Sequence, residues 1–305
     1  MGILQHKLLS ELDNKGFKAR IVSIEHLEDL KSELENLFDS GVVDKELYEK
    51  ELKSINYNYL NELSGAKSII VIGMPQPIRK LSFNWSEKVH EVLIPPVYTS
   101  ETDKQVRSIM EALLNPEGFK FLKATLPLKL LAVKSGLSMY GKNNISYIPG
   151  LGSFNKLIAF ITDMPFIEDS WQDVKTMPTC DNCNACLKNC PTSAIDSKRF
   201  IIHINKCITY FNEYGGEFPS WLNNNSHNSL VGCMRCQTIC PANAGYIKTI
   251  EINDVFSEDE ISLILNNTDI NILPEKTKNT LEKLDLTDYH KEKILSRNLS
   301  VLINK

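Results

Sequence analysis

The chain has 305 residues, of which 34 are basic and 38 acidic, so its formal net charge is −4 at neutral pH. Hydrophobic residues make up 42% and charged residues 24%, a composition that excludes a disordered or fibrous protein. All eight cysteines lie between Cys180 and Cys240, so the requirement for thiols is confined to one segment.

The N-terminal residues carry charges every few positions and lack the apolar core of a signal peptide. No stretch approaches the roughly 20 apolar residues that a membrane-spanning helix needs. We therefore expect a cytoplasmic protein that does not associate with a membrane. In that reducing compartment cysteines serve as metal ligands more often than as disulfide partners.

Strands and helices alternate in the first half of the chain. Alternating or continuous apolar runs predict strands, and apolar residues three and four positions apart predict helices. The predicted strands are Lys18–Ile24, Ile69–Ile72 and Leu157–Thr162, and the predicted helices cover residues 25–63, 108–114 and 127–134. This order indicates an α/β layer domain over residues 1–165, which we expect to bind a cofactor and substrate.

The last part of the chain is predicted to be helical. Ser257 and Glu260 have the spacing of a capping box, which marks the start of a helix. Apolar residues continue at helical spacing to Leu302. The expected fold class is therefore α+β, with an α/β domain over residues 1–165, a cysteine-bearing domain over residues 166–250 and a small helical region over residues 251–305.

The cysteines form two runs, each ending in a Cys-Pro step. The first, Cys180-x2-Cys183-x2-Cys186-x3-Cys190-Pro, has the spacing by which bacterial ferredoxins bind [4Fe–4S] clusters, with the fourth cysteine bound to the other cluster. The second run begins only at Cys233, and Leu230 stands where a leading cysteine would be. Cys207 is the candidate for this absent ligand.

A crossed scheme uses every cysteine once, in a ferredoxin-like domain with two [4Fe–4S] clusters. The first set is Cys180, Cys183, Cys186 and Cys240, and the second set is Cys190, Cys207, Cys233 and Cys236. Two zinc sites of four thiolates each would also use pairs of cysteines two residues apart, and buried thiols without metal are a further alternative. The spacing favours the clusters.

Seven pieces of the sequence, in this order, resemble the epoxyqueuosine reductase family, whose members are related to reductive dehalogenases. The pieces are Ser135-Gly136-Leu137, Gly141-Lys142-Asn143, Gly152-Ser153-Phe154, residues 180–195, Cys207-Ile208-Thr209-Tyr210, residues 232–241 and Arg297-Asn298-Leu299. The resemblance implies that electrons pass from two [4Fe–4S] clusters to cobalamin. It also implies that the first domain is similar to the cobalamin-binding domain of the family, with Gly141, Lys142, Asn143 and Ser153 as cofactor-binding residues.

The chain departs from the family at the position of the catalytic acid. The family has an aspartate shortly before a proline, and the matching stretch, residues 123–127, has Ala124 at that place. Alanine cannot supply a proton. By analogy with the tyrosines of the dehalogenases, Tyr140 and then Tyr98 are the candidate proton donors, and hence the candidate catalytic residues.

Three functions remain open. The first is a cobalamin-dependent reductase of a small molecule or another unidentified substrate. The second is a true tRNA epoxyqueuosine reductase with a substituted proton donor, which the net negative charge does not favour, since proteins that grip RNA usually present a basic face. The third is an electron-transfer protein that activates a corrinoid partner. Each needs a low-potential electron donor such as ferredoxin or flavodoxin.

Overall fold

The computed structural model describes residues 2–304, which form two compact units of discontinuous chain segments. The first unit comprises the segments 1–75, 101–184 and 197–202. The second comprises the segments 76–100, 185–196 and 203–305. Each unit is described separately. The three domains expected from the sequence follow other boundaries and stay a prediction.

The first unit is built on a four-stranded sheet in the order β1-β2-β8-β5, in which all neighbours are antiparallel. Its strands are β1 (Lys18–Ser23), β2 (Ser68–Pro75), β5 (Phe121–Ala124) and β8 (Asn155–Thr162). Every residue of β2 except Pro75 is buried. The three strands predicted from apolar runs are thus confirmed. Strand β2 lies between β1 and β8, and its uninterrupted apolar run fits a strand with both faces covered.

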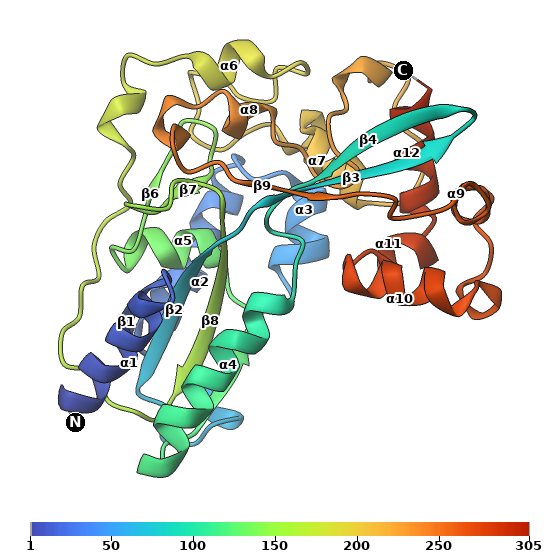
Figure 1. The fold of residues 1–305 in the computed structure, drawn as a ribbon. Helices are drawn as coiled ribbons and strands as arrows, with labels where there is room; N and C mark the ends of the chain where they lie inside the picture. The colour runs from blue at the N-terminus through green and yellow to red at the C-terminus, as the bar shows by residue number, and fades with distance from the viewer. Residues whose placement is uncertain (1, 305) are drawn as a thin grey trace. The chain divides into compact units, whose positions relative to one another are not determined.

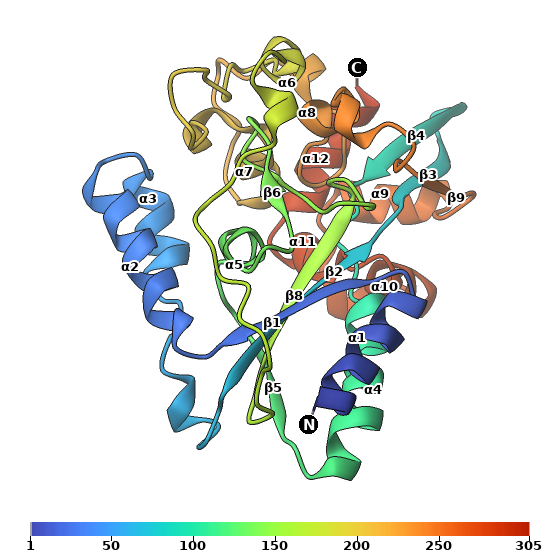
Figure 2. The same ribbon diagram turned by 90° about the vertical axis from the view of Figure 1, so that its left-hand side faces the viewer.

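Helices cover both faces of this sheet (Figures 1 and 2). On one face α1 (Gly2–Asn14) and α4 (Glu101–Leu114) pack Leu8, Leu12, Val106 and Met110 against inward side chains of β2 and β8. On the other face α2 (His26–Asp39) and α5 (Leu128–Lys134) pack Leu30 and Leu131. The helices predicted within residues 108–114 and 127–134 are confirmed as parts of α4 and α5.

The single helix predicted for residues 25–63 is wrong in its extent. Helix α2 ends at Asp39, and Gly41 then adopts the left-handed conformation that ends many helices. A short helix α3 (Lys45–Leu47) and a π-helical turn at Tyr48–Leu52 follow. Apolar spacing alone did not reveal the break at Gly41.

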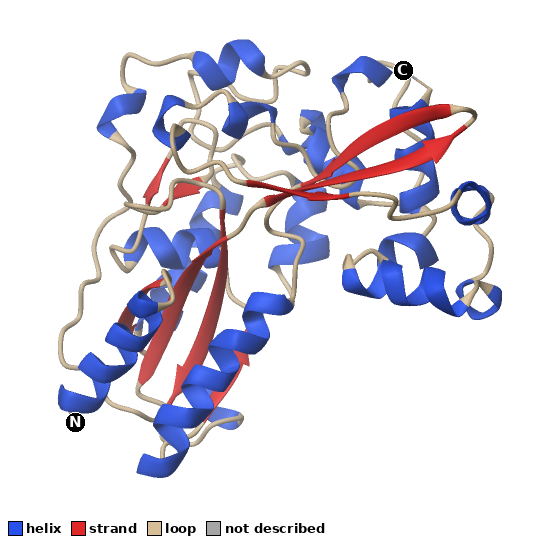
Figure 3. Ribbon diagram, viewed as in Figure 1, coloured by secondary structure: helices blue, strands red, loops and turns tan. Residues whose placement is uncertain are grey.

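The second unit contains a three-stranded sheet in the order β4-β3-β9, drawn in red in Figure 3. Strands β3 (Ile78–Trp85) and β4 (Lys88–Ile94) form a hairpin, and β9 (Thr249–Ile252) pairs in parallel with β3. Ser86 and Glu87 connect the hairpin with φ values of 51° and 63°. Turns with two left-handed residues favour Asn-Gly, so this Ser-Glu pair gave no signal and the hairpin was not predicted.

The predicted helical C-terminal region is confirmed. It consists of α9 (Glu258–Leu265), α10 (Glu275–Lys283), α11 (Thr287–Lys291) and α12 (Ile294–Ile303). The predicted capping box is present, since Ser257 Oγ accepts from the N–H of Glu260 at 3.3 Å and Glu260 Oε2 accepts from the N–H of Ser257 at 2.8 Å. These helices bury their apolar faces against Leu81 and Phe83 of β3.

The remaining elements are short. They are strands β6 (Met139–Tyr140) and β7 (Ser146–Tyr147), helices α6 (Ala185–Asn189), α7 (Ile208–Glu213) and α8 (Arg235–Thr238), and 3₁₀ turns at Tyr59–Asn61, Asn115–Glu117, Pro178–Cys180, Ile204–Lys206, Asn224–Ser226, Pro241–Asn243 and Ile270–Ile272. Within residues 2–304 no helix combines the length and the apolar character needed to span a bilayer.

Candidate metal centre

All eight cysteines are free, partly exposed thiols on loops and very short helices. Cys186 lies in α6, Cys236 lies in α8, and Cys207 directly precedes α7. Cysteines three residues apart need one tight turn of chain to point the same way, and these single-turn helices supply it. The local structure follows from the cysteine spacing.

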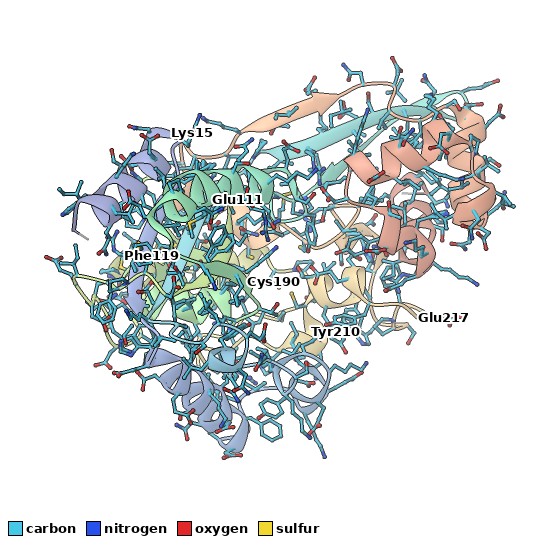
Figure 4. All side chains as sticks on the ribbon, turned by 90° about the horizontal axis from the view of Figure 1, so that it is seen from below. Lys15, Glu111, Phe119, Cys190, Tyr210 and Glu217 are labelled. Atoms are coloured by element: carbon cyan, nitrogen blue, oxygen red, sulfur yellow. The ribbon has the colours of Figure 1, made fainter. Side chains whose placement is uncertain are left out.

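The second set of cysteines lies entirely in the second unit, where Figure 4 labels Cys190 and Tyr210. Burial raises the pKa of the Cys207 thiol, and the nearby Cys190 thiol adds to the shift. Burial also raises the pKa of Cys233 to about 12, with contributions from Cys207 and Cys190. These three thiols are therefore close enough to interact electrostatically, which brings a cysteine of the first run together with Cys207 and Cys233.

Backbone N–H groups point at these sulfur atoms. The N–H of Ala194 donates to Cys190 Sγ at 3.3 Å. Hydrogen bonds from the backbone of Thr209 and Arg235 act against the rise in pKa of Cys207 and Cys233. Such donors stabilise thiolates, and they also help set the reduction potential of a bound iron–sulfur cluster. The second set therefore fits a [4Fe–4S] cluster in its donor chemistry.

No three His, Cys, Asp or Glu side chains among residues 2–304 converge closely enough to hold one metal ion. A zinc ion would need its thiolates together at about 2.3 Å from one centre. In a [4Fe–4S] cube each thiolate binds a different iron atom, so the sulfur ligands stand further apart.

The first set of cysteines is divided between the units, with Cys180 and Cys183 in the first and Cys186 and Cys240 in the second. Lys142 lies beside the first two. Its backbone N–H donates to Cys180 Sγ at 3.5 Å, and its ammonium donates to the Cys183 carbonyl oxygen at 2.9 Å. Lys142 was expected to bind cobalamin, but its contacts in this unit are with Cys180, Cys183 and the Asn184 side chain.

Replacing Lys142 with methionine should lower the reduction potential of the cluster bound by the first set. Unit charges several ångströms apart at an effective dielectric constant of about 20 interact by about 2 kcal/mol, which is at most about 100 mV for one electron. Redox titration followed by EPR measures the shift. The exposed Lys120→Met change removes the same charge elsewhere and should leave the potential unaltered; equal shifts in both variants would contradict the assignment.

Gly141 and Asn143 build the turn that carries Lys142. A Cβ atom on Gly141 would lie 2.6 Å from Asn143 Oδ1 and 2.6 Å from Tyr147 Cε2, so only glycine fits. Asn143 is buried and donates to Tyr147 Oη at 3.0 Å. Ser153, the remaining residue expected at the cofactor, is also buried. The Asn143 side chain thus shapes the turn.

The two candidate proton donors have different surroundings. Tyr140 is buried in the first unit, and its ring meets the Phe200 ring edge to face with the ring centroids 4.9 Å apart. Burial, and next to it the charge of Glu33, raises the pKa of Tyr140 above the ordinary value for tyrosine. Tyr98 lies in the second unit, and its phenol donates to Glu213 Oε1. Its pKa is also raised, mainly by burial.

Ala124, which stands at the place of the family's aspartate, ends strand β5 opposite Ala159 of β8. It is 4% exposed and belongs to the core on the α5 face of the sheet. The next residue is fixed by Tyr59, whose hydroxyl accepts from the N–H of Thr125 at 2.9 Å and donates to the Thr125 carbonyl oxygen at 3.2 Å. Residue 124 is therefore surrounded by apolar groups.

A buried polar network next to the second set was not predicted. Asn298 of α12 donates to the carbonyl oxygens of Asn212 at 2.9 Å and Leu230 at 2.8 Å. Asn212 in turn donates to the Gly232 carbonyl oxygen at 2.8 Å, and His227 Nδ1 lies 2.9 Å from Asn212 Oδ1. The network fixes the loop before Cys233. The one sequence feature that pointed to this network was the Arg297-Asn298-Leu299 piece.

Residues 179–243 match the family model of a 4Fe-4S double cluster binding domain. This match covers the eight cysteines, and it supports two [4Fe–4S] clusters as expected from their spacing.

Curated relatives are epoxyqueuosine reductases. The chain is 32% identical over 133 residues to the enzyme of Staphylococcus aureus, an alignment that covers 44% of this chain and 33% of that protein. It is 28% identical over 211 residues to the enzyme of Bacillus anthracis, covering 60% of this chain and 50% of that protein. The chain thus spans half or less of the length of these relatives.

Solved structures of epoxyqueuosine reductases share the fold. The Bacillus subtilis structure, with its catalytic loop swung out of the active site, has a TM-score of 0.70 and 21% identity and covers 98% of this chain and 81% of that one. A structure with an epoxyqueuosine-modified tRNA stem loop has a TM-score of 0.69 and 20% identity, covering 98% and 80%. The α+β fold expected from the sequence is confirmed.

Proposed function

Because the chain is a relative of the epoxyqueuosine reductases and carries a double [4Fe–4S] cluster domain, we propose that it is a cobalamin-dependent reductase. In this proposal electrons from a low-potential donor such as ferredoxin or flavodoxin pass through two clusters to a corrinoid, and on to a small molecule or another substrate. The gathering of Cys190, Cys207 and Cys233 in one unit carries the proposal.

The ligand sets proposed are the crossed ones. Cys190, Cys207, Cys233 and Cys236 would bind one cluster, within the second unit. Cys180, Cys183, Cys186 and Cys240 would bind the other. The backbone donors at Cys180 and Cys190 support both assignments, because N–H groups aimed at the sulfur favour the ionised thiolate that iron requires.

A bound corrinoid would supply a strongly reducing metal centre that no amino-acid side chain provides. The segment proposed to hold it is the turn at Gly141 with the adjoining residues to Ser153. Since the side chains of Lys142 and Asn143 are engaged within the protein, their proposed part is to fix the shape of this turn.

A product that gains hydrogen requires a proton donor. We assign this part to Tyr140, because its phenol, whose pKa burial raises further above neutrality, carries a proton at neutral pH, and no hydrogen bond joins that phenol to another of the described side chains. Tyr98 is the weaker candidate, since its phenol already donates to Glu213.

A second candidate is tRNA epoxyqueuosine reduction with Tyr140 in place of the family's aspartate. A structure similar to this chain over 98% of its length contains an epoxyqueuosine-modified tRNA stem loop, which favours this reading. A third candidate is an electron-transfer protein that reduces a corrinoid partner. This candidate follows if the clusters are present and cobalamin does not bind.

The test is anaerobic purification followed by measurement of iron, sulfide, zinc and cobalt, with visible spectra recorded during titration with cobalamin. We expect about eight iron atoms per chain and corrinoid bands that change on binding. Iron without cobalamin binding would favour the electron-transfer protein, and zinc without iron would refute the proposal. Turnover of epoxyqueuosine-containing tRNA then separates the second candidate from the first.

A further inference from the structure

Tyr98 connects the two chain segments that carry Cys207 and Cys233. It follows strand β4, and its phenol donates to Glu213 Oε1, at the C-terminal end of α7. Helix α7 begins directly after Cys207. The phenol therefore restrains the helix that this cysteine precedes.

The same phenol lies against the turn before Cys233. A Cβ atom built on Gly232 would lie 2.4 Å from Tyr98 Oη and 2.9 Å from Tyr98 Cε2. Gly232 also has a φ of 61°, a conformation that favours glycine. Only a residue without a side chain lets Tyr98 approach this closely. The Tyr98 phenol therefore packs directly against the backbone of this turn.

Both ends of Tyr98 are held in place. Arg79 of β3 donates to the Tyr98 carbonyl oxygen, and Arg79 Nη1 lies 4.0 Å from Asp285 Oδ2. The Tyr289 ring meets the Tyr98 ring edge to face, with centroids 6.2 Å apart. Because the backbone, the ring and the hydroxyl of Tyr98 are already fixed, its side chain loses little conformational entropy when it restrains another segment.

The loop before Cys233 is attached to the same hairpin from which Tyr98 extends. The N–H of Leu230 donates to the carbonyl oxygen of Leu93 in β4 at 2.7 Å. Leu230 and Val231 belong to the core of the second unit. The loop therefore has its apolar end anchored in the core, and at its cysteine end the Tyr98 phenol packs against Gly232, whose carbonyl oxygen accepts from Asn212 at 2.8 Å.

We propose that Tyr98, through its hydrogen bond to Glu213 and its contact with Gly232, is a positioning residue for the cluster bound by Cys190, Cys207, Cys233 and Cys236. It fixes the spacing between the Cys207 segment and the Cys233 segment, and so sets the hydrogen bonding and packing around the sulfur ligands that tune the reduction potential. This role differs from proton donation. It rests on the proposed ligand set of the second cluster.

The test compares Tyr98→Phe and Glu213→Gln with the unchanged protein. Both variants keep side-chain size. Tyr98→Phe removes the phenol and its hydrogen bond, and Glu213→Gln replaces the charged acceptor of that bond with a weaker, neutral one. In the apo-protein, amide hydrogen exchange over residues 207–213 and 229–236 should quicken about tenfold, as expected for loss of a hydrogen bond to a charged group. In the iron-loaded protein, the midpoint potential and EPR spectrum of one cluster should change while those of the other stay constant.

Tyr59→Phe is the matched control. It removes a buried phenol that bonds the backbone of Thr125 in the first unit, and it should leave both cluster potentials and the exchange of residues 229–236 unchanged. Wild-type exchange and potentials in both Tyr98→Phe and Glu213→Gln would overturn the positioning role, as would equal changes in Tyr59→Phe. Absence of iron from the unchanged protein would instead refute the proposed function, so the two failures are distinguishable.

Discussion

Replacement of Cys207 by alanine should remove one of two clusters and leave the other intact. Iron content should fall from about eight to about four atoms per chain, and electron transfer to the acceptor should fall to background. The reason is that Cys207 supplies the ligand for which the second cysteine run has no member of its own, and its thiol lies within electrostatic reach of Cys190 and Cys233.

Four alanine variants together test the crossed grouping by EPR and iron analysis. Cys190→Ala should remove the same cluster signal as Cys207→Ala, although Cys190 belongs to the first run. Cys180→Ala and Cys240→Ala should both remove the other signal. If Cys190→Ala instead matched Cys180→Ala, each run would bind its own cluster and the crossed scheme would be wrong.

Restoring the family's aspartate, by Ala124→Asp, should destabilise the protein by about 3 kcal/mol and not create activity. Ala124 is 4% exposed in strand β5 and packs in the apolar core with Ala159 and Leu131. A carboxylate placed there loses its hydration without gaining a partner charge, and uncompensated buried charges cost several kcal/mol. Urea denaturation at neutral pH measures the change.

Thr125→Asp is the control for this variant. Thr125 is the next residue and is exposed, and its hydrogen bonds to Tyr59 use only backbone atoms, so an aspartate there should be nearly neutral for stability. A stable Ala124→Asp protein that reduces epoxyqueuosine in tRNA would contradict the prediction. That outcome would show that position 124 reaches a substrate, and it would favour the tRNA reading of the function.

The sequence predicted those parts of the fold that a local pattern specifies. Strands β2 and β8 were predictable because both faces of each are covered, so their apolar residues run without interruption. The capping box at Ser257 was predictable because its two partners are three residues apart. The hairpin of β3 and β4 was missed because Ser86 and Glu87 adopt left-handed conformations that their types rarely take.

The candidate site, like the fold, was predictable only where a local sequence pattern specifies it. The spacing of the cysteines indicated which thiols would gather, because each run is short and one turn of chain orients its members. The side chains around them were not predictable from spacing. Tyr98 and Glu213 are 115 residues apart in the sequence, and Asn298 and Asn212 are 86 apart. Nothing near either residue in the chain indicates such a partner.

The two hydrogen bonds that Asn298 donates have a consequence for the order in which the protein matures. They fix the carbonyl oxygens of Asn212 and Leu230, and Asn212 in turn holds Gly232, the residue before Cys233. During translation the cysteines leave the ribosome before Asn298 does. The loop that presents Cys233 therefore reaches its final shape only after α12 has been synthesised.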